Sequence, residues 1–180
     1  MTGCGSGSGA ASTPAVPAPA ARPTLPLLPV TNVPGIAHDE RALTRSFVAS
    51  EGPKGVDLND LLDRWRFVTA AQRQFKGGPP RTFVDIVSRT LQFGSPTGAR
   101  AYVRFVRDNP GTYLGPLRAA VPVAKGGRDG YLLTARGCGC HEENPLFLYV
   151  ASSGERVTWL MTNGPQVTAG STLTLATHAP

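Results

Sequence analysis

The most reactive stretch of the chain is the run Cys138-Gly139-Cys140-His141-Glu142-Glu143. Two thiolates and an imidazole this close together could chelate a soft or borderline ion, copper(I) or zinc. The Cys-x-Cys pair could instead shuttle electrons as a strained disulfide, because residues i and i+2 of an extended chain lie near the upper limit of the Cα separation that a disulfide accepts. A fixed local disulfide that holds an irregular loop, and a pair of free thiols, are the remaining interpretations.

Other residues that could do chemistry are sparse. Asp57, Asp60 and Asp63 are spaced by three, which puts them along one face of a helix and could suggest a cation site. Carboxylates are also common at helix starts because they complement the helix dipole, and this second interpretation is favoured. His38 lies beside two acidic residues and His178 near the C-terminus, without a nucleophile elbow, phosphate loop or His-Glu-x-x-His motif. We therefore expect no catalytic residue, metal site or cofactor, and no enzyme activity.

The charge pattern limits the choice of partners. The formal net charge is +6 over 180 residues, and it comes almost wholly from arginine. The arginines are scattered singly and no nucleic-acid-binding motif appears, so we expect no nucleic-acid partner. A basic surface could still meet an anionic envelope polymer or an acidic protein. No stretch approaches the roughly 20 apolar residues of a membrane-spanning helix.

The segment from Thr82 to Asn109 organises the expected fold. Residues 82–93 alternate apolar and polar side chains and are rich in β-branched types, which predicts a half-buried strand. Ser95 and Pro96 then form a helix N-cap and first helical position. Apolar residues continue at helical spacing until the proline after Asn109, so one strand leads into one amphipathic helix.

The remaining elements are expected on either side of this unit. The patterns predict a short helix within 39–50, a helix capped by Asp57 and a strand within 65–75. They also predict a proline-interrupted strand at 117–124 that is either an edge strand or a bulged one, a strand at 131–136, a hairpin of 146–151 with 156–162, and a weak helix within 166–178. Trp65 and Trp159 fit the core or one sheet face.

This order predicts an α+β protein: an antiparallel sheet of about five to six strands with helices packed on one face. Residues 1–30 are rich in Gly, Ser, Ala and Pro and offer little apolar surface, so they read as a disordered tether. Residues 31–180 are expected to form a single domain.

The N-terminal triplet Thr2-Gly3-Cys4 and the Gly/Ser/Pro tether resemble the lipobox end of actinobacterial cell-envelope lipoproteins. The run Phe93, Gly98, Ala99, Tyr102 and the later Val-x-Trp-Leu strand around Trp159 resemble their small sensor-type α+β domains. The resemblance implies lipidation at Cys4 and an extracytoplasmic, membrane-anchored protein. It also implies an export signal upstream of Met1, or one that this methionine replaced.

The same resemblance bears on the cysteine loop. If Cys4 carries lipid, two of the three cysteines remain, and an oxidising compartment would join Cys138 to Cys140 as a disulfide. The expected function is a lipid-anchored extracytoplasmic binding or sensor-like domain without catalytic activity. The alternative is a thiol-redox or soft-metal-handling protein that uses the Cys138/Cys140 loop.

Overall fold

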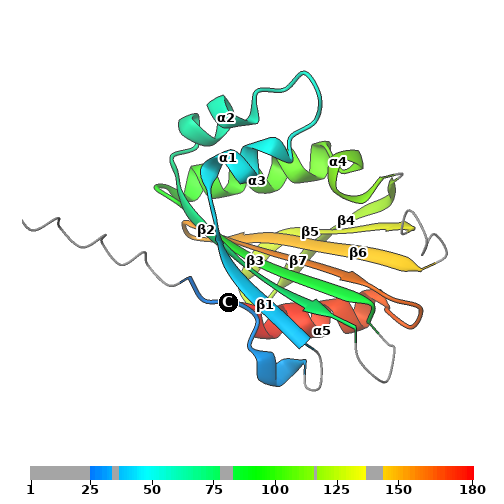
Figure 1. The fold of residues 1–180 in the computed structure, drawn as a ribbon. Coiled ribbons are helices and arrows are strands. Elements are labelled where there is room, and N and C mark those ends of the chain that lie inside the picture. The colour runs from blue at the N-terminus through cyan, green and yellow to red at the C-terminus, as the bar shows by residue number, and fades with distance from the viewer. Residues whose placement is uncertain (1–24, 34–36, 78–82, 116, 137–143) are drawn as a thin grey trace, which may run out of the picture.

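The computed structural model describes residues 25–33, 37–77, 83–115, 117–136 and 144–180. These residues form one antiparallel sheet of seven strands with helices on both of its faces (Figure 1). The strands are β1 (Ala37–Leu43), β2 (Phe67–Lys76), β3 (Asp85–Phe93), β4 (Leu117–Lys125), β5 (Arg128–Arg136), β6 (Pro145–Ser153) and β7 (Arg156–Asn163). The helices are the 3-10 turn η1 (Val30–Asn32), α1 (Arg45–Ser50), α2 (Leu58–Arg64), α3 (Pro96–Asp108), α4 (Gly111–Leu114) and α5 (Ala169–His178).

The strand order across the sheet is β1-β2-β3-β7-β6-β5-β4. All neighbouring strands are antiparallel, and the connection from β3 through α3 and α4 carries the chain from the middle of the sheet to its far edge. The predicted α+β class is confirmed. Of the two alternatives for the strand that contains Pro122, an edge strand or a bulged one, the structure places it at the edge of the sheet. The sheet has more strands than the expected five to six.

The unit predicted around residues 82–109 is confirmed within the described residues. The Ser95 hydroxyl accepts a hydrogen bond from the backbone N–H of Gly98 at 3.1 Å, and Pro96 is the first residue of α3. The apolar side of α3 includes Tyr102 and Val106, both buried, and packs on the sheet. A serine cap followed by proline thus sets where the helix begins, and its apolar stripe sets which side faces the sheet.

The expected helix within residues 39–50 is half wrong. Residues 37–43 form strand β1, and α1 begins only after Thr44, whose side chain accepts a hydrogen bond from the N–H of Phe47. β1 pairs with β2 along its whole length, and six of its seven residues are exposed. Residues 37–43 therefore form a strand because β2 supplies hydrogen-bond partners for their backbone. The helical spacing of their side chains has little effect, since a helix here would have no apolar face to bury.

The expectation that the helices pack on one face of the sheet is wrong. Figure 1 shows α1 to α4 on one side of the sheet and α5 on the other, and two separate buried clusters line the two faces. The physical reason lies in β6, where residues 146–151 are buried at every position. A strand that is apolar on both parities needs cover on both faces.

The packed part of the protein also includes residues assigned above to the tether. Leu25, Leu27 and Leu28 are buried, and Leu28 is completely so. The N–H of Leu28 donates to the Ser88 hydroxyl at 3.2 Å, and its carbonyl accepts from Arg73 at 2.6 Å. The expected boundary at residue 30 is therefore several residues too late.

Arg128 ties the β4–β5 hairpin to the end of α5. Its side chain is 8% exposed and donates to the carbonyls of Ala176 at 2.9 Å and Ala179 at 2.5 Å, and to the Thr158 hydroxyl at 3.1 Å. A guanidinium at this position satisfies the carbonyls left open at a helix C-terminus and complements the helix dipole. The hairpin that borders the site described next is thus anchored from the opposite face of the sheet.

Candidate functional site

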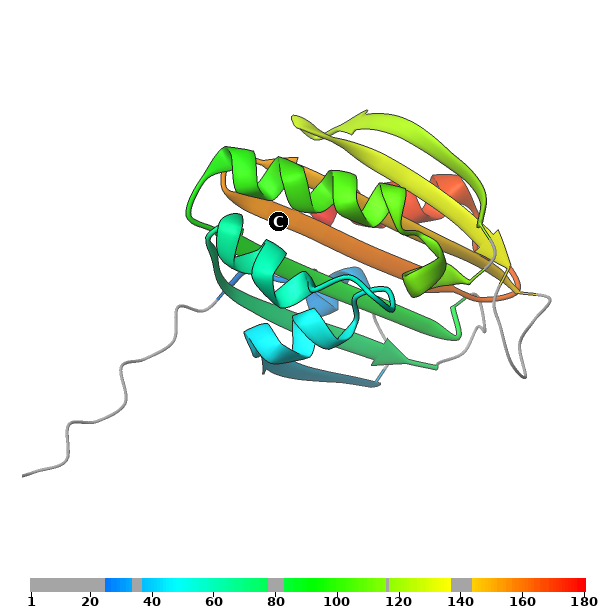
Figure 2. The ribbon, with the colours of Figure 1, turned by 90° about the horizontal axis from the view of Figure 1, so that it is seen from above.

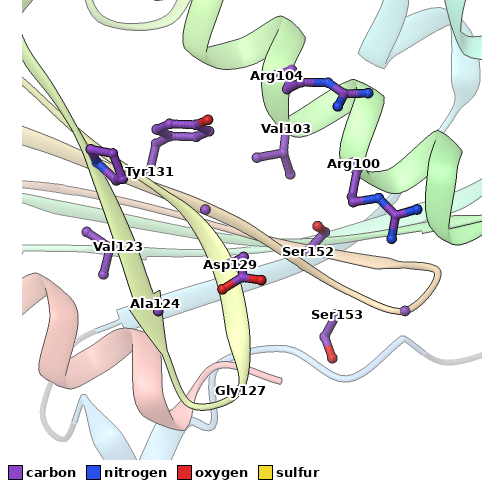
Figure 3. A pocket seen from close by; sticks show the side chains of 13 residues that line it. Arg100, Val103, Arg104, Val123, Ala124, Gly127, Asp129, Tyr131, Ser152 and Ser153 are labelled. Carbon is purple, nitrogen blue, oxygen red and sulfur yellow. The ribbon is translucent and has the colours of Figure 1, made fainter.

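A groove of about 540 Å³ runs between α3 and the β4–β5 hairpin (Figure 3). Figure 2 looks down on the helical layer and shows α3 between the α1–α2 pair on one side and this hairpin on the other. The lining of this α3 groove includes Arg100, Val103, Arg104, Val123, Asp129 and Tyr131, with the β6–β7 turn closing one end. Its volume lies within the range of small-molecule sites.

The α3 wall of the groove is basic. Arg100 and Arg104 are one helical turn apart, so both reach the same side of α3, and Figure 3 shows both from that helix. Both are exposed, and neither forms an ion pair within the described part of the chain. Arg100 donates to the Thr97 hydroxyl at 3.4 Å, and the charge of Arg104 helps to lower the pKa of Asp108 without forming an ion pair with it. The remaining guanidinium donors are available for an anion.

The rest of the groove combines apolar residues with the hydroxyls of Ser152 and Ser153 and one opposing charge, that of Asp129. Val103 is buried and Tyr131 is half-buried beneath Arg107, which stacks 5.0 Å from the ring centre and donates to its hydroxyl at 2.8 Å. Asp129 enters from the β5 side. A Cβ at Gly130 would lie 2.1 Å from the carbonyl oxygen of Val150, so glycine allows β5 and β6 to approach closely along the groove.

A second, smaller site lies beside α1 and α4, over the middle of the sheet. This Arg89 pocket has a volume of about 310 Å³, and its lining includes Glu51, Arg89, Thr112, Tyr113, Trp159 and Met161. Arg89 is 8% exposed, and each of its three guanidinium nitrogens donates a hydrogen bond. It donates to both carboxylate oxygens of Glu51 at 2.6 and 2.7 Å and to Gln72 at 2.7 Å, and it lies 4.6 Å from the centre of the Trp159 ring.

Two polar atoms on side chains that border the Arg89 pocket are fully buried, so they do not face its open space, and they have no hydrogen-bond partner among the described residues: the hydroxyl of Tyr113 and the indole N–H of Trp159. Burial, and next the negative charge of Glu51, raise the pKa of Tyr113 to about 12. The Tyr102 hydroxyl faces Tyr113 closely enough to oppose this rise, but the two hydroxyls do not meet in hydrogen-bonding geometry. Tyr113 therefore stays a neutral donor at physiological pH.

One cross-strand row joins the two sites. Directly paired residues of neighbouring strands point to the same face. Such pairs connect, in order, Arg41, Gln72, Arg89, Trp159, Val150, Tyr131 and Pro122 from one sheet edge to the other. The Arg89 pocket sits at the middle of this row, and Tyr131 and Pro122 line the α3 groove at its end. Both sites thus share one side of the sheet.

The acidic triplet does not form a cation site. The Asp57 side chain accepts from the N–H of Asp60 as the N-cap of α2, and Asp63 pairs with Arg45 at 2.9 Å. Among the described residues, no group of three or more His, Cys, Asp and Glu side chains is placed to hold a metal ion.

The other residues singled out in the sequence fall in several places. Cys4, Cys138 and Cys140 lie outside the described residues, as does His141. His38 lies on β1 with its ring 5.9 Å from that of Phe75.

The two tryptophans are both packed against α3 or the sheet. Trp65 contacts the rings of Tyr102 and Phe105, and Trp159 is 2% exposed in the same cluster. The expected core position is confirmed for Trp159, which also borders the Arg89 pocket. Trp65 is half-buried at the end of α2 and packs against the edge of the same cluster.

Neither site was predicted from the sequence, although one signal was present. Val87, Leu91 and Phe93 share a parity on β3, and Arg89 interrupts this apolar face. A single charged residue within a buried strand face indicates a paired charge. The groove has no comparable local signal, because its walls come from segments far apart in the sequence.

Comparison with models of known protein families, with curated proteins and with solved structures finds no match. Within the described residues, none of the helices is both long and apolar enough to span a bilayer. The functional argument therefore starts from the geometry of the two sites.

Proposed function

We propose that this protein is a lipid-anchored, extracytoplasmic binding domain without catalytic activity, and that its α3 groove takes an amphiphilic anion. The observation that carries the proposal is the pair Arg100 and Arg104, exposed and without ion-pair partners in the described chain, beside an apolar wall. An apolar body would lie on Val103 and Tyr131 while its anionic group meets the arginines.

The negative charge of Asp129 limits which anions could bind in the groove. Asp129 lines the side opposite α3, so a second negative group placed there would be repelled. A single carboxylate or phosphate at one end of an alkyl or aromatic body suits this arrangement. The proposed anchor, a lipid on Cys4, would hold the groove close to a membrane surface, where amphiphiles of this kind are concentrated.

Binding can be tested with three probes at submicellar concentration: decyl phosphate, the uncharged decyl maltoside, and inorganic phosphate. We expect saturable binding of decyl phosphate by calorimetry and much weaker binding of the other two. Arg100→Ala and Arg104→Ala should each weaken binding about three- to tenfold, which corresponds to about 0.7–1.4 kcal/mol. Arg64→Ala removes the same charge from α2 and should have little effect, while Asp129→Asn should strengthen binding.

Two results would overturn the groove assignment. Equal affinity for decyl phosphate and decyl maltoside would remove the role of the anion. Unchanged affinity in both arginine variants would place binding elsewhere. Weaker binding by Asp129→Asn would instead indicate a zwitterionic ligand.

Localisation is tested separately, because the anchor and the groove are independent. Expressed with its own upstream sequence, the protein should be found in the membrane fraction with a lipid-modified Cys4, and Cys4→Ala should release it or leave it unprocessed. An unmodified protein in the soluble cytoplasm would end the lipoprotein proposal and leave the groove proposal standing.

A further inference from the structure

The two edges of the sheet differ in how well they are protected against further strand pairing. β4, at one edge, contains Pro122 and a register shift between Leu117 and Ala119, and both features disturb a ladder. β1, at the other edge, contains no proline and pairs with β2 in an unbroken register over all seven of its residues. β1 is therefore longer than an average strand and lacks two of the features by which proteins protect an edge.

The outer side of β1 is open. Residues 37–42 are all exposed, and Figure 2 shows β1 as the outermost strand at one margin of the sheet. Every second residue of an edge strand directs its backbone N–H and C=O away from the neighbouring strand. Within the described chain, the backbone groups of residues 37–42 have partners only on β2. The outward groups of β1 are thus free to pair with another strand.

The order of the charges on β1 makes this strand complementary to itself. Asp39 and Arg41 are two residues apart, so they share one face, and neither has an ion-pair partner in the described part of the chain. Arg41 stacks on the ring of Phe47 at 4.8 Å. Glu40 points to the opposite face and is bound there by Arg73 at 2.6 Å. Charges of a single sign would repel a second copy of β1, whereas this arrangement can attract one.

Strand geometry limits the registers in which two copies could pair. Opposite residues of an antiparallel pair direct their backbone groups either both toward each other or both away. In two identical strands, a two-fold axis must therefore pass through a residue and not between two residues. With the axis at Glu40, all seven residues are paired, and Asp39 of each copy lies opposite Arg41 of the other. An axis at Asp39 or at Arg41 leaves fewer pairs and puts two aspartates or two arginines opposite each other.

We propose that β1 is a dimerisation edge, at which a second copy of this chain continues the sheet antiparallel about a two-fold axis at Glu40. The interface is isologous, so the pairing of Asp39 with Arg41 occurs twice. The two Glu40 side chains meet at the axis, where each keeps Arg73 as its counter-ion. The α3 groove lies toward β4 and β5 at the other edge, so both grooves of the dimer stay open. The proposal does not depend on the function proposed for that groove.

Charge reversal tests the pairing. Sedimentation of the 180-residue chain with a reducing agent, from about 10 µM to 1 mM, should show a reversible monomer–dimer equilibrium. Arg41→Asp and Asp39→Arg each put like charges opposite one another twice, and each should raise the Kd at least about tenfold. The double variant Asp39→Arg/Arg41→Asp restores opposite charges and should recover dimerisation. Lys125→Asp, the matched reversal at an exposed position of β4, should leave the Kd unchanged.

Cysteine cross-linking tests the register independently of the charges. In a Cys4→Ser/Cys138→Ser/Cys140→Ser background, Glu40→Cys puts two thiols directly opposite each other, at a Cα separation that a disulfide accepts. His38→Cys is exposed on the same face, but its two copies would be about 13 Å apart along the strands. Mild oxidation should therefore cross-link Glu40→Cys efficiently and His38→Cys poorly. Circular dichroism of every variant confirms that it is folded.

Any of four outcomes would overturn the proposal. A protein that is monomeric at every concentration would leave the edge to a strand of a different protein. A Kd unaffected by both single charge reversals would place the contact elsewhere on the molecule. A folded double variant that dimerises as weakly as the single variants would remove the role of the Asp39 and Arg41 pairs. Equal cross-linking of Glu40→Cys and His38→Cys would show that the strands have no fixed register.

Discussion

Arg89 on β3 and Trp159 on β7 are direct cross-strand partners, and the guanidinium carbon of Arg89 lies 4.6 Å from the centre of the Trp159 ring. A cation over an aromatic face is attracted by the ring quadrupole, and burial strengthens this contact. The same guanidinium is bound by Glu51, which follows α1 in the sequence. This single side chain therefore connects the helical layer to the middle of the sheet.

Glu51→Gln should destabilise the protein, because it leaves the buried charge of Arg89 without a counter-ion. The cost should be about 1–3 kcal/mol, less than for a fully buried pair, because the Glu51 side chain is 25% exposed. The double variant Arg89→Met/Glu51→Leu should recover most of this loss, since it removes both charges together. Urea unfolding of the single and double variants measures the coupling, and a double variant less stable than Glu51→Gln would contradict the expectation.

Gly98→Ala should destabilise the protein by about 1–3 kcal/mol, although alanine is the better helix former. A Cβ at Gly98 would lie 2.1 Å from the carbonyl oxygen of Trp65, so α3 would have to move away from the residue that follows α2. The matched control is Gly170→Ala in α5, where the nearest atom to a Cβ is 3.7 Å away. That change should stabilise by about 0.4–1 kcal/mol, and thermal unfolding of both variants tests the contrast.

Asp85→Asn should make the protein more stable at neutral pH. Burial raises the pKa of Asp85, which also accepts hydrogen bonds from Gln74, and the negative charge of Asp39 adds to the rise. Because the folded-state pKa lies above the unfolded value of 3.8, the stabilisation from the protonated form is complete below that value and is lost as the pH rises through the folded-state pKa. Asparagine removes this loss and keeps an oxygen for Gln74.

The stability difference between Asp85→Asn and the wild type should therefore be clear near pH 7 and vanish near about pH 3. Urea unfolding at the two pH values measures it. Asp39→Asn should give a smaller change of the same sign, because it removes only one of the causes of the pKa rise. A stability gain that is equal at both pH values would show that the titration of Asp85 is not its source.

Leu28→Ala should cost about 2–5 kcal/mol, because Leu28 is completely buried against the α5 face of the sheet. Val30→Ala, only two residues later but 38% exposed, should cost less than about 1 kcal/mol. Chemical unfolding of the pair measures the contribution of this N-terminal segment to the core. Equal and small effects would mean that residues 25–30 do not pack as described.

Local patterns in the sequence determined most of the elements. The Ser95-Pro96 start of α3 and the Asp57 cap of α2 follow from capping chemistry. The hairpin of β6 with β7 follows from two apolar runs joined by a short turn that contains Gly154. The same reasoning limited the Pro122 strand to an edge or a bulge, because proline cannot donate to a sheet ladder, and the structure places it at the edge.

Only the tertiary structure decided the features that join distant segments. β1 is a strand because β2 pairs with it, and the helices divide between two faces because β6 is buried on both. The α3 groove and the Arg89 pocket combine side chains from helices and strands separated by many residues. Of these residues, only Arg89 was recognisable in the sequence, as a charged residue on an apolar strand face. Its contacts with Glu51 and Trp159 could not be predicted, because no local pattern around either residue specifies a contact between distant segments.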